Sequence, residues 1–285
     1  MTTLPTTAFG LGPLPGTDLA QAADVVLSES PLPHIPQLPD RGVGSDLIGR
    51  TAALLEIPIA PGPRGWRVAA RKRADADRMA RDLDHLEELW HGKVDTVKVQ
   101  LAGPFTLAAE VEMANGHRMI TDPGALRDLT DALLEASNQH RSDVAGRFGA
   151  TVLQLDEPRL GDVMAGTLKG ATDYEAIPAI PEPQETLHRF GEHLLHTPVL
   201  IDDTPWQTTD PRTCNRDALA RLLDTGARIA IPTMQPRELY RVFDELQIDP
   251  AQTQIDVYAN PADTLLGSAR NYAAAREMHE ELASQ

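Results

Sequence analysis

The sequence of 285 residues contains a single cysteine, Cys214. One cysteine excludes an internal disulfide, and it also excludes a cysteine-rich zinc site. Aromatic residues make up only 4% of the chain, against 41% hydrophobic residues. We therefore expect a core of Leu, Val, Ile and Ala rather than of stacked rings, which suits helices covering a parallel sheet.

Positive charge and long apolar runs are also scarce. Lys and Arg number 26 against 42 Asp and Glu, which gives a formal net charge of −16. This acidity opposes attraction to nucleic acid and to anionic lipid surfaces. No apolar run approaches the roughly 18 residues that cross a bilayer, and Met1 to Gly10 lacks the basic and apolar regions of a secretion signal. We expect a cytoplasmic protein without nucleic acid or membrane partners.

Strand and helix patterns alternate along most of the chain, which predicts a parallel sheet. Four prolines between residues 31 and 39 exclude a continuous helix there and predict an ordered loop. Short aliphatic runs predict strands at residues 7–11, 96–101, 151–155, 199–201, 228–231 and 254–258. Apolar stripes predict helices at residues 17–30, where Thr17 is the expected cap, and at 45–56, 75–92, 104–116, 122–148, 185–196, 217–224, 236–246 and 264–282.

The architecture that fits this alternation best is a single eight-stranded α/β barrel over residues 1–285. Single barrels of this type commonly reach about 250 residues, so the length does not require two domains. Two further strands are expected around residues 66–70 and 160–171. An open doubly wound sheet would show the same alternation, but a glycine-rich phosphate loop is missing after the first strand. Only Gly10, Gly12 and Gly16 occur there, with Pro13 and Pro15 interposed.

Acidic residues follow two of the predicted strands. Asp156 and Glu157 follow the strand at 151–155, and Asp202 and Asp203 follow the strand at 199–201. The carboxyl ends of barrel strands surround one pocket, so these carboxylates could hold an ammonium group, bind a hard cation or share a proton. The alternative is that the acids cap helices or lie in solvated loops.

Other residues near these strand ends have two interpretations each. Trp206 could stack on a pterin or another flat ligand, or it could cover the barrel end as core. Cys214 precedes a predicted helix whose dipole favours a thiolate, and the alternative is a small, partly buried loop residue. Arg41 and Arg50 flank the proline-rich loop that contains His34, and they could bind an anion there or form surface ion pairs.

Three stretches carry a resemblance to a known family. Residues 11–17 read Leu-Gly-Pro-Leu-Pro-Gly-Thr, residues 101–106 read Leu-Ala-Gly-Pro-Phe-Thr, and residues 154–158 read Gln-Leu-Asp-Glu-Pro. In this order they resemble the first-strand turn, the Gly-Pro-Val-Thr turn and the Gln-Ile-Asp-Glu-Pro strand of cobalamin-independent methionine synthases. That family shares its barrel type, a (β/α)8 TIM barrel, with uroporphyrinogen decarboxylase.

The resemblance implies methyl transfer from a folate donor to the thiol of homocysteine, a step of methionine biosynthesis. It nominates Asp156 and Glu157 as the catalytic residues. Asp156 would contact the amino group of the substrate, and Glu157 would support the contacting residues or orient a loop. With Gly12 and Gly103 in the matching turns, and with Asp202, Asp203 and Trp206 at the next strand end, these residues form the expected site for an amino acid or a pterin-like ligand.

The zinc site of the family has no counterpart in the sequence. The family uses a His-x-Cys at a strand end, a Glu at the next strand and a Cys near the carboxyl terminus. Ile201 to Asp203 stand in the first of these places, residues 228–234 contain no Glu, and Asp263 stands at the last cysteine. Pro13 also replaces the serine of the first turn. Carboxylates suit magnesium, calcium or manganese better than zinc.

We therefore expect no bound zinc and no other bound cofactor, with folate as the methyl donor if the reaction is retained. Two other hypotheses stand beside this one. The chain could decarboxylate an acidic tetrapyrrole, a reaction that needs no metal, or it could be a noncatalytic ligand-binding barrel. The sequence makes no prediction of the oligomeric state.

Overall fold

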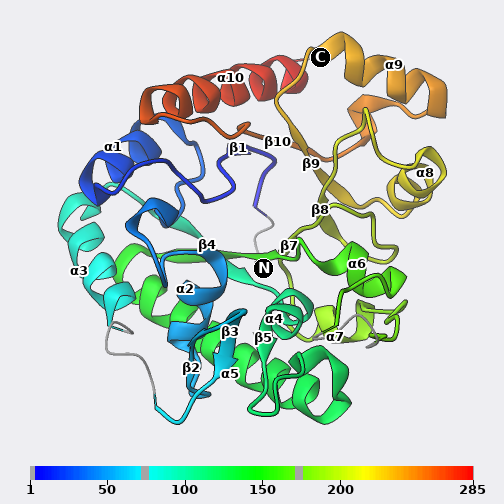
Figure 1. Ribbon diagram of the computed structural model, residues 1–285. Helices are drawn as coiled ribbons and strands as arrows, with labels where there is room; N and C mark the ends of the chain where they lie inside the picture. Colours follow the sequence, from blue (N-terminus) through cyan, green and yellow to red (C-terminus); the bar gives the residue numbers. More distant parts are fainter. Residues whose placement is uncertain (1–3, 72–76, 171–175, 285) are drawn as a thin grey trace.

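The computed structural model describes residues 4–71, 77–170 and 176–284. Its centre is a curled sheet of seven parallel strands in the order β1-β10-β9-β8-β7-β6-β4, and Figure 1 shows helices arranged around the outside of this sheet. The expected α/β class and the parallel sheet are confirmed. The strands are β1 (Ala8–Phe9), β4 (Thr96–Ala102), β6 (Ala150–Asp156), β7 (Leu194–His196), β8 (Trp206–Thr208), β9 (Arg228–Pro232) and β10 (Ile255–Tyr258).

The proline-rich segment 31–39 lies between the two edge strands of the curled sheet. Leu32 pairs with Phe9 of β1, and His34 pairs with Lys98 of β4, each through a single parallel bridge. Proline has no amide hydrogen to donate, so this segment cannot form a continuous ladder. The sheet has the curvature of a barrel, and its two edges are joined by isolated bridges rather than by an eighth paired strand.

The helices pack their apolar faces against the outward side chains of the sheet, where aliphatic residues form the main core. Side-chain caps mark where several of them begin, and Asp18 rather than Thr17 caps the first. Among the described residues, no helix combines the length and the apolar character that crossing a membrane requires. The helices are α1 (Leu19–Glu29), α2 (Leu47–Leu54), α3 (Arg78–Trp90), α4 (Pro104–Glu110), α5 (Pro123–Phe148), α6 (Leu160–Ala165), α7 (Gln184–His188), α8 (Arg216–Asp224), α9 (Pro236–Leu246) and α10 (Leu265–Ala283).

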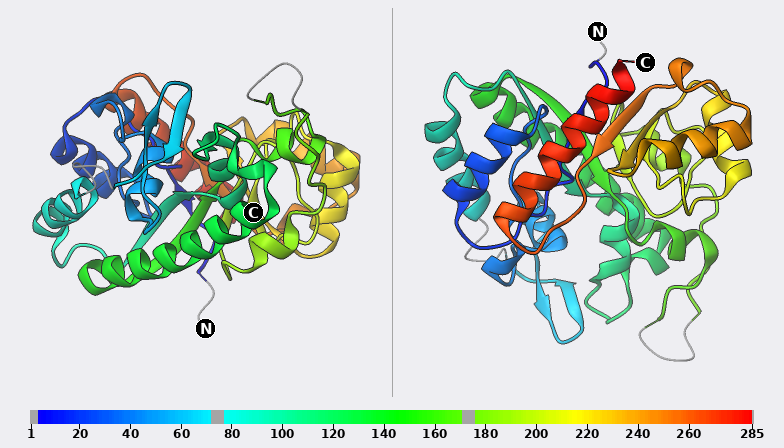
Figure 2. Two further views of the ribbon diagram at one scale, coloured as in Figure 1. Left: turned by 60° about the horizontal axis from the view of Figure 1, so that its bottom comes forward. Right: turned by 90° about the horizontal axis from the view of Figure 1, so that it is seen from above.

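The prediction of two additional barrel strands is wrong. Residues 65–68 form β3, which belongs to a separate sheet with β2 (Ile59–Gly62) and β5 (Val111–Glu112) in the order β2-β3-β5. Residues 160–165 form α6, and residue 171 lies outside the described residues, as do residues 75 and 76 of the predicted third helix. The small sheet lies apart from the curled sheet in Figure 1, and its β2–β3 hairpin, in light blue, projects from the molecule in the right view of Figure 2.

The predictions between residues 185 and 208 are also wrong in part. The helix predicted at 185–196 ends at His188, and residues 194–196 form β7 instead. The expected strand at 199–201 has no regular structure. β8 was not predicted. Residues 197–205 connect β7 to β8 without a helix, and the side chain of Gln207 holds them. Its Oε1 accepts from the N–H of Ile201 at 3.0 Å, and its Nε2 donates to the carbonyl of Ile201 at 2.8 Å.

Inward-facing side chains fill the curled sheet in levels along its axis. At the amino end, Arg228 and Asp256 form a buried ion pair with an N–O distance of 2.6 Å. Next to this pair lies an apolar cluster of Phe9, Leu32, Leu194, Trp206 and Ala230. Polar residues of β4 and β6 occupy the level nearest the carboxyl ends of the strands. Functional sites in α/β barrels lie at this carboxyl end.

Candidate functional site

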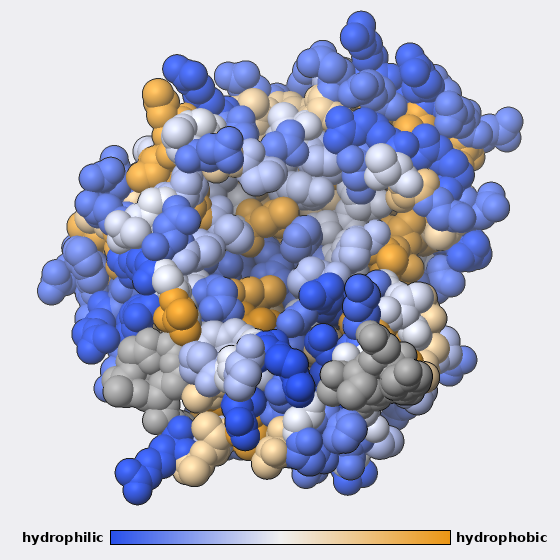
Figure 3. Space-filling view, viewed as in Figure 1, coloured by the Kyte–Doolittle hydropathy of each residue, from blue (hydrophilic) through white to orange (hydrophobic). Residues whose placement is uncertain are grey.

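A cavity of about 320 Å³ lies at the carboxyl end of the sheet. Figure 3 shows this face of the molecule, which is hollowed over the centre of the sheet. The lining is largely apolar, with a few polar groups. It comprises Leu11, Pro13, Gln37, Leu47, Asp156, Pro158, His196, Ala259, Asn260, Pro261, Ala262, Ser268 and Tyr272.

Asp156 ends β6 and lies in the wall of this cavity. The residue is 6% exposed, and its carboxylate accepts a hydrogen bond from Gln154 Nε2 at 2.6 Å. Burial raises the pKa of Asp156 to about 7, although the bond from Gln154 and the charge of Lys98 act in the opposite direction. A carboxyl group that titrates near neutral pH can bind a cation or transfer a proton.

Lys98 is a site residue that sequence reasoning missed. It lies on β4, is fully buried, and donates a hydrogen bond from Nζ to Oε1 of Gln154. Gln154 in turn donates to Asp156 and, at 2.8 Å, to the carbonyl of Leu11. Burial lowers the pKa of Lys98 to about 7, while Asp156 raises it. The result is a chain of three side chains, from Lys98 through Gln154 to Asp156, that leads from the interior to the cavity.

His196 ends β7 and lines two cavities. Its Nδ1 lies 2.9 Å from the hydroxyl oxygen of Thr208 on the next strand. Burial lowers the pKa of His196 to about 4, and the charge of Lys98 lowers it as well, so the ring is neutral at pH 7. His196 and Pro158 line the first cavity and also an adjoining cavity of about 870 Å³.

The adjoining cavity contains the only cysteine of the chain. Cys214 lines this cavity just before α8, whose first turn is capped by Asn215. Thr197 also lines it, and its buried hydroxyl has no hydrogen-bond partner. Cys214 is partly buried in a loop, which agrees with the simpler of the two interpretations given to it.

Glu157 points away from the cavity and into the start of α4. It is fully buried, and its oxygens accept from the backbone N–H groups of Phe105 at 2.9 Å and Thr106 at 2.6 Å. Burial raises its pKa to about 7, against the effect of these hydrogen bonds. A Cβ on Gly103 would lie 2.3 Å from Oε1 of Glu157. Glu157 therefore holds the turn between β4 and α4, and Gly103 leaves the space for its carboxylate.

The predicted convergence of Asp202 and Asp203 on Asp156 is wrong. Their side chains are 58% and 86% exposed, and neither lines the cavity of Asp156. Asp202 lies 3.4 Å from Arg221, and Asp203 lies 4.0 Å from the ring of His188. The physical reason is that β7 ends at residue 196. Residues 197–205 then run toward the opposite end of the sheet, so the two acids precede β8 instead of following a strand.

The predicted ligand-stacking position of Trp206 is wrong for the same reason. Trp206 begins β8 at the amino end of the sheet, is 5% exposed, and donates from Nε1 to Asp256 at 2.8 Å. Its ring packs edge-on against Phe9, and the guanidinium of Arg228 lies 4.3 Å from the ring centre. The indole is part of the interior packing, which was the alternative interpretation.

The arginines beside the proline-rich segment do not line the cavity of Asp156. Arg41 forms an ion pair with Asp82 at 2.9 Å and donates to the carbonyl of Thr17 at 2.8 Å. Arg50 donates to the sulfur of Met79 at 3.6 Å, and burial lowers its pKa to about 10. His34 is buried, with its Nε2 at 3.4 Å from the hydroxyl of Tyr272.

The residues present do not fit the zinc site that the resemblance implies. In residues 4–71, 77–170 and 176–284, no group of three or more His, Cys, Asp or Glu side chains could hold a metal ion. Because β7 is the strand after β6, the place of the His-x-Cys falls at the end of β7. His196 is followed there by Thr197 and Pro198. Asp263, at the place of the last cysteine, is exposed.

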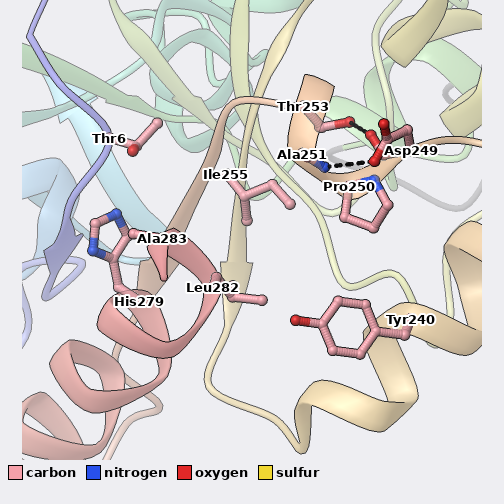
Figure 4. Close-up of a pocket in the computed structure, with 10 residues that line it drawn as sticks. All are labelled: Thr6, Tyr240, Asp249, Pro250, Ala251, Thr253, Ile255, His279, Leu282 and Ala283. Carbon is pink, nitrogen blue, oxygen red and sulfur yellow. Dashed lines mark hydrogen bonds between the residues drawn. The ribbon is translucent and has the colours of Figure 1, made fainter. Parts of the chain in front are cut away.

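Another cavity, of about 390 Å³, lies between α9 and α10 at the amino end of the sheet. Figure 4 shows its lining, in which the N–H of Ala251 donates to the carboxylate of Asp249 and the hydroxyl of Thr253 donates to the backbone carbonyl of Asp249. The side chain of Gln252 also donates to this carboxylate, which is therefore bound within its own turn. This cavity lies away from the polar residues of β4 and β6, and we do not assign the site to it.

No family model matches the chain, and no curated protein matches it in sequence. Among solved structures, a B12-independent methionine synthase from Shewanella sp. W3-18-1 in complex with selenomethionine is similar, with a TM-score of 0.48 and 12% sequence identity. The similarity covers 78% of this chain and 72% of that chain.

Proposed function

We propose that the cavity of about 320 Å³ binds a small molecule with an amino group, and that Asp156 binds this group. The supporting observation is a buried carboxylate in the cavity wall that receives a hydrogen bond from one side chain, Gln154. A carboxylate can accept about four hydrogen bonds. Asp156 therefore retains acceptor capacity for the N–H groups of a ligand, and an ammonium ion would also neutralise its charge.

The rest of the cavity favours an amino acid with a short apolar side chain. Leu11, Leu47 and Pro158 supply apolar surface, and the volume of about 320 Å³ is near the lower end of the range for ligand sites. Among residues 4–71, 77–170 and 176–284, no Arg or Lys lines this cavity. The lining therefore gives no support to a tetrapyrrole with several carboxylates, the substrate of the decarboxylase hypothesis.

The resemblance of the three sequence stretches adds a sulfur-containing amino acid, methionine or homocysteine, as the first ligand to test. It also adds methyl transfer from a folate as the reaction to assay. The residues present do not fit zinc, and the proposed function involves no metal. The adjoining cavity of about 870 Å³, which shares Pro158 and His196 with the first, gives room for a larger second molecule such as a pterin.

The test is a thermal-shift titration with L-methionine and L-homocysteine. A ligand at 100 times its Kd stabilises the folded state by about 2.7 kcal/mol, so we expect a clear rise in Tm for the natural chain. Asp156→Asn should abolish this rise. The matched control is Asp202→Asn, which changes an exposed carboxylate and should respond like the natural chain.

Two further measurements separate binding from catalysis. The deaminated analogue 4-(methylthio)butanoate should give no shift, because it lacks the group that Asp156 binds. Formation of methionine from homocysteine and methyltetrahydrofolate reports on transfer, and binding without turnover would favour the noncatalytic hypothesis. If Asp156→Asn shows the same shift as the natural chain, the site lies elsewhere.

A further inference from the structure

Gln100 is a buried side chain whose hydrogen-bonding groups are not used. It lies on β4, two residues after Lys98, and is 5% exposed. Neither its Nε2 nor its Oε1 has a hydrogen-bond partner. Buried amides are almost always paired, because an unpaired one retains the cost of losing its water. Gln100 therefore has one donor group and one acceptor group available to a ligand.

The neighbouring strand provides a direct comparison. In the register of β4 and β6, Gln100 lies opposite Gln154. Gln154 donates to Leu11 and Asp156 and accepts from Lys98, so both ends of its amide are used. Two glutamines at the same level of the same sheet thus differ completely in hydrogen bonding. The structure satisfies Gln154 and leaves Gln100 unsatisfied.

The amide of Gln100 lies next to Gly12, beneath the residues that line the cavity, and is not itself part of the lining. A Cβ on Gly12 would lie 3.3 Å from Cδ of Gln100 and 3.2 Å from Cδ of Gln37, and Gly12 itself has a φ of +129°. Gln37 lines the cavity, as do the two residues that flank Gly12 in the sequence. Ala102, two residues further along β4, pairs with Asp156. The amide of Gln100 thus lies between Gly12 and the interior, one level below Asp156.

We propose that Gln100 binds the head group of an α-amino acid whose ammonium group lies on Asp156. Nε2 of Gln100 would donate to the carboxylate of the ligand, and Oε1 would accept from its ammonium group. An α-amino acid carries these two groups on one carbon atom, so it matches the adjacent donor and acceptor of a carboxamide. This inference rests on the proposed function and assigns a specificity-determining residue to the same site.

A stability measurement tests the unused amide without any ligand. Gln100→Leu removes a buried amide that has no partner, so we expect Tm to rise by about 2–4 °C. The matched control is Gln207→Leu on β8, where both ends of a buried amide bond to Ile201. That change should lower Tm by a similar or larger amount. An unchanged or lowered Tm for Gln100→Leu would show that the amide has a structural role and would overturn the inference.

A binding measurement then tests what the amide recognises. Isothermal titration compares L-methionine with 3-(methylthio)propylamine, which keeps the ammonium group and lacks the carboxylate. Gln100→Leu should weaken L-methionine binding about tenfold or more and should affect the amine much less. Equal weakening of both would contradict the assignment of the carboxylate to Gln100. If L-methionine does not bind the natural chain, the proposed function fails for this ligand, while the stability comparison still decides whether Gln100 is unpaired.

Discussion

The two ends of the curled sheet each contain a buried acid and a buried base, but the two pairs are built differently. At the amino end, Asp256 accepts four hydrogen bonds: one from Thr7, one from Trp206 and two from Arg228. Arg228 also donates to the carbonyls of Leu4 and Pro5. At the carboxyl end, Lys98 reaches Asp156 only through Gln154.

This difference distinguishes a structural pair from a candidate site. Desolvated charges are tolerated when hydrogen bonds replace the lost water, and the amino end meets this condition. The carboxyl end does not, because Gln100 is unpaired and burial shifts the pKa values of both Asp156 and Lys98 to about 7. Unsatisfied and shifted groups beside a cavity are the pattern expected where a ligand completes the set of hydrogen bonds.

The largest effect that tests this comparison is expected at the amino end. Asp256→Asn should lower the free energy of unfolding by about 3–5 kcal/mol, because it leaves Arg228 buried without its counter-charge. Asp156→Asn should not lower it in the absence of ligand, because one hydrogen bond is at stake and because the raised pKa of Asp156 means that burial disfavours its ionised form. Urea denaturation of the two variants measures both values. Equal losses would mean that the carboxyl-end pair is structural as well.

An intermediate effect is expected in the pH dependence of stability. The folded state raises the pKa of Asp156 from 3.8 to about 7, so the stabilisation from its protonated form is present below pH 4 and is lost toward pH 7. It lowers the pKa of Lys98 from 10.5 to about 7, so the stabilisation from the neutral amine is present above pH 10.5 and is lost as the pH falls toward 7. The contribution of the pair to stability is therefore lowest near pH 7.

The double variant Lys98→Met with Asp156→Asn isolates this contribution. It retains His34 and His196, the titratable groups that also face Lys98. Burial lowers their pKa values more than the charge of Lys98 does, so most of their effect cancels in the difference from the natural chain. Relative to this variant, the natural chain should gain about 1–3 kcal/mol between pH 7 and pH 5 and again between pH 7 and pH 9. Urea midpoints at the three pH values provide the measurement. A difference that does not vary with pH would rule out the shifted pair.

The smallest effect is expected for the acids outside both pairs. Asp202→Ala removes an exposed ion pair with Arg221 and should change the free energy of unfolding by less than about 0.5 kcal/mol. Ligand-induced shifts in Tm should be the same as for the natural chain. A large loss of stability or of ligand response would restore Asp202 to the functional site that the sequence suggested.

Local sequence patterns predicted the fold where an element carries its own signals. The helix at 236–246 was predicted with its observed bounds, because Pro236 marks its start and its apolar stripe is regular. The strands at 96–102 and 150–156 are long and alternate clearly. In contrast, β7 and β8 have three residues each. Their ends are fixed by pairing with neighbouring strands, which leaves almost no periodic signal in the sequence.

The candidate site was predicted in part, for a related reason. Asp156 could be found because it follows a strong strand directly. Asp202 and Asp203 were misplaced because a strand was expected at 199–201, within the connection that runs back from the end of β7 to the start of β8. Lys98 and Gln100 alternate with apolar residues within a buried strand, and this alternation was a usable signal. Whether their side chains find hydrogen-bond partners depends on β6 and on the turn at Gly12, which are distant from them in the sequence.

The segment at 31–39 also affects how the molecule meets other chains. An unpaired strand at the border of a sheet is a template for adding a strand from another molecule. Here the borders β1 and β4 both face the same proline-containing stretch. The N–H of Ile35 donates to the carbonyl of Lys98 at 3.1 Å, and the N–H of Lys98 donates to the carbonyl of Pro33 at 2.8 Å. Since that stretch occupies both borders and cannot itself extend the ladder, the central sheet is protected against growth by edge-to-edge association.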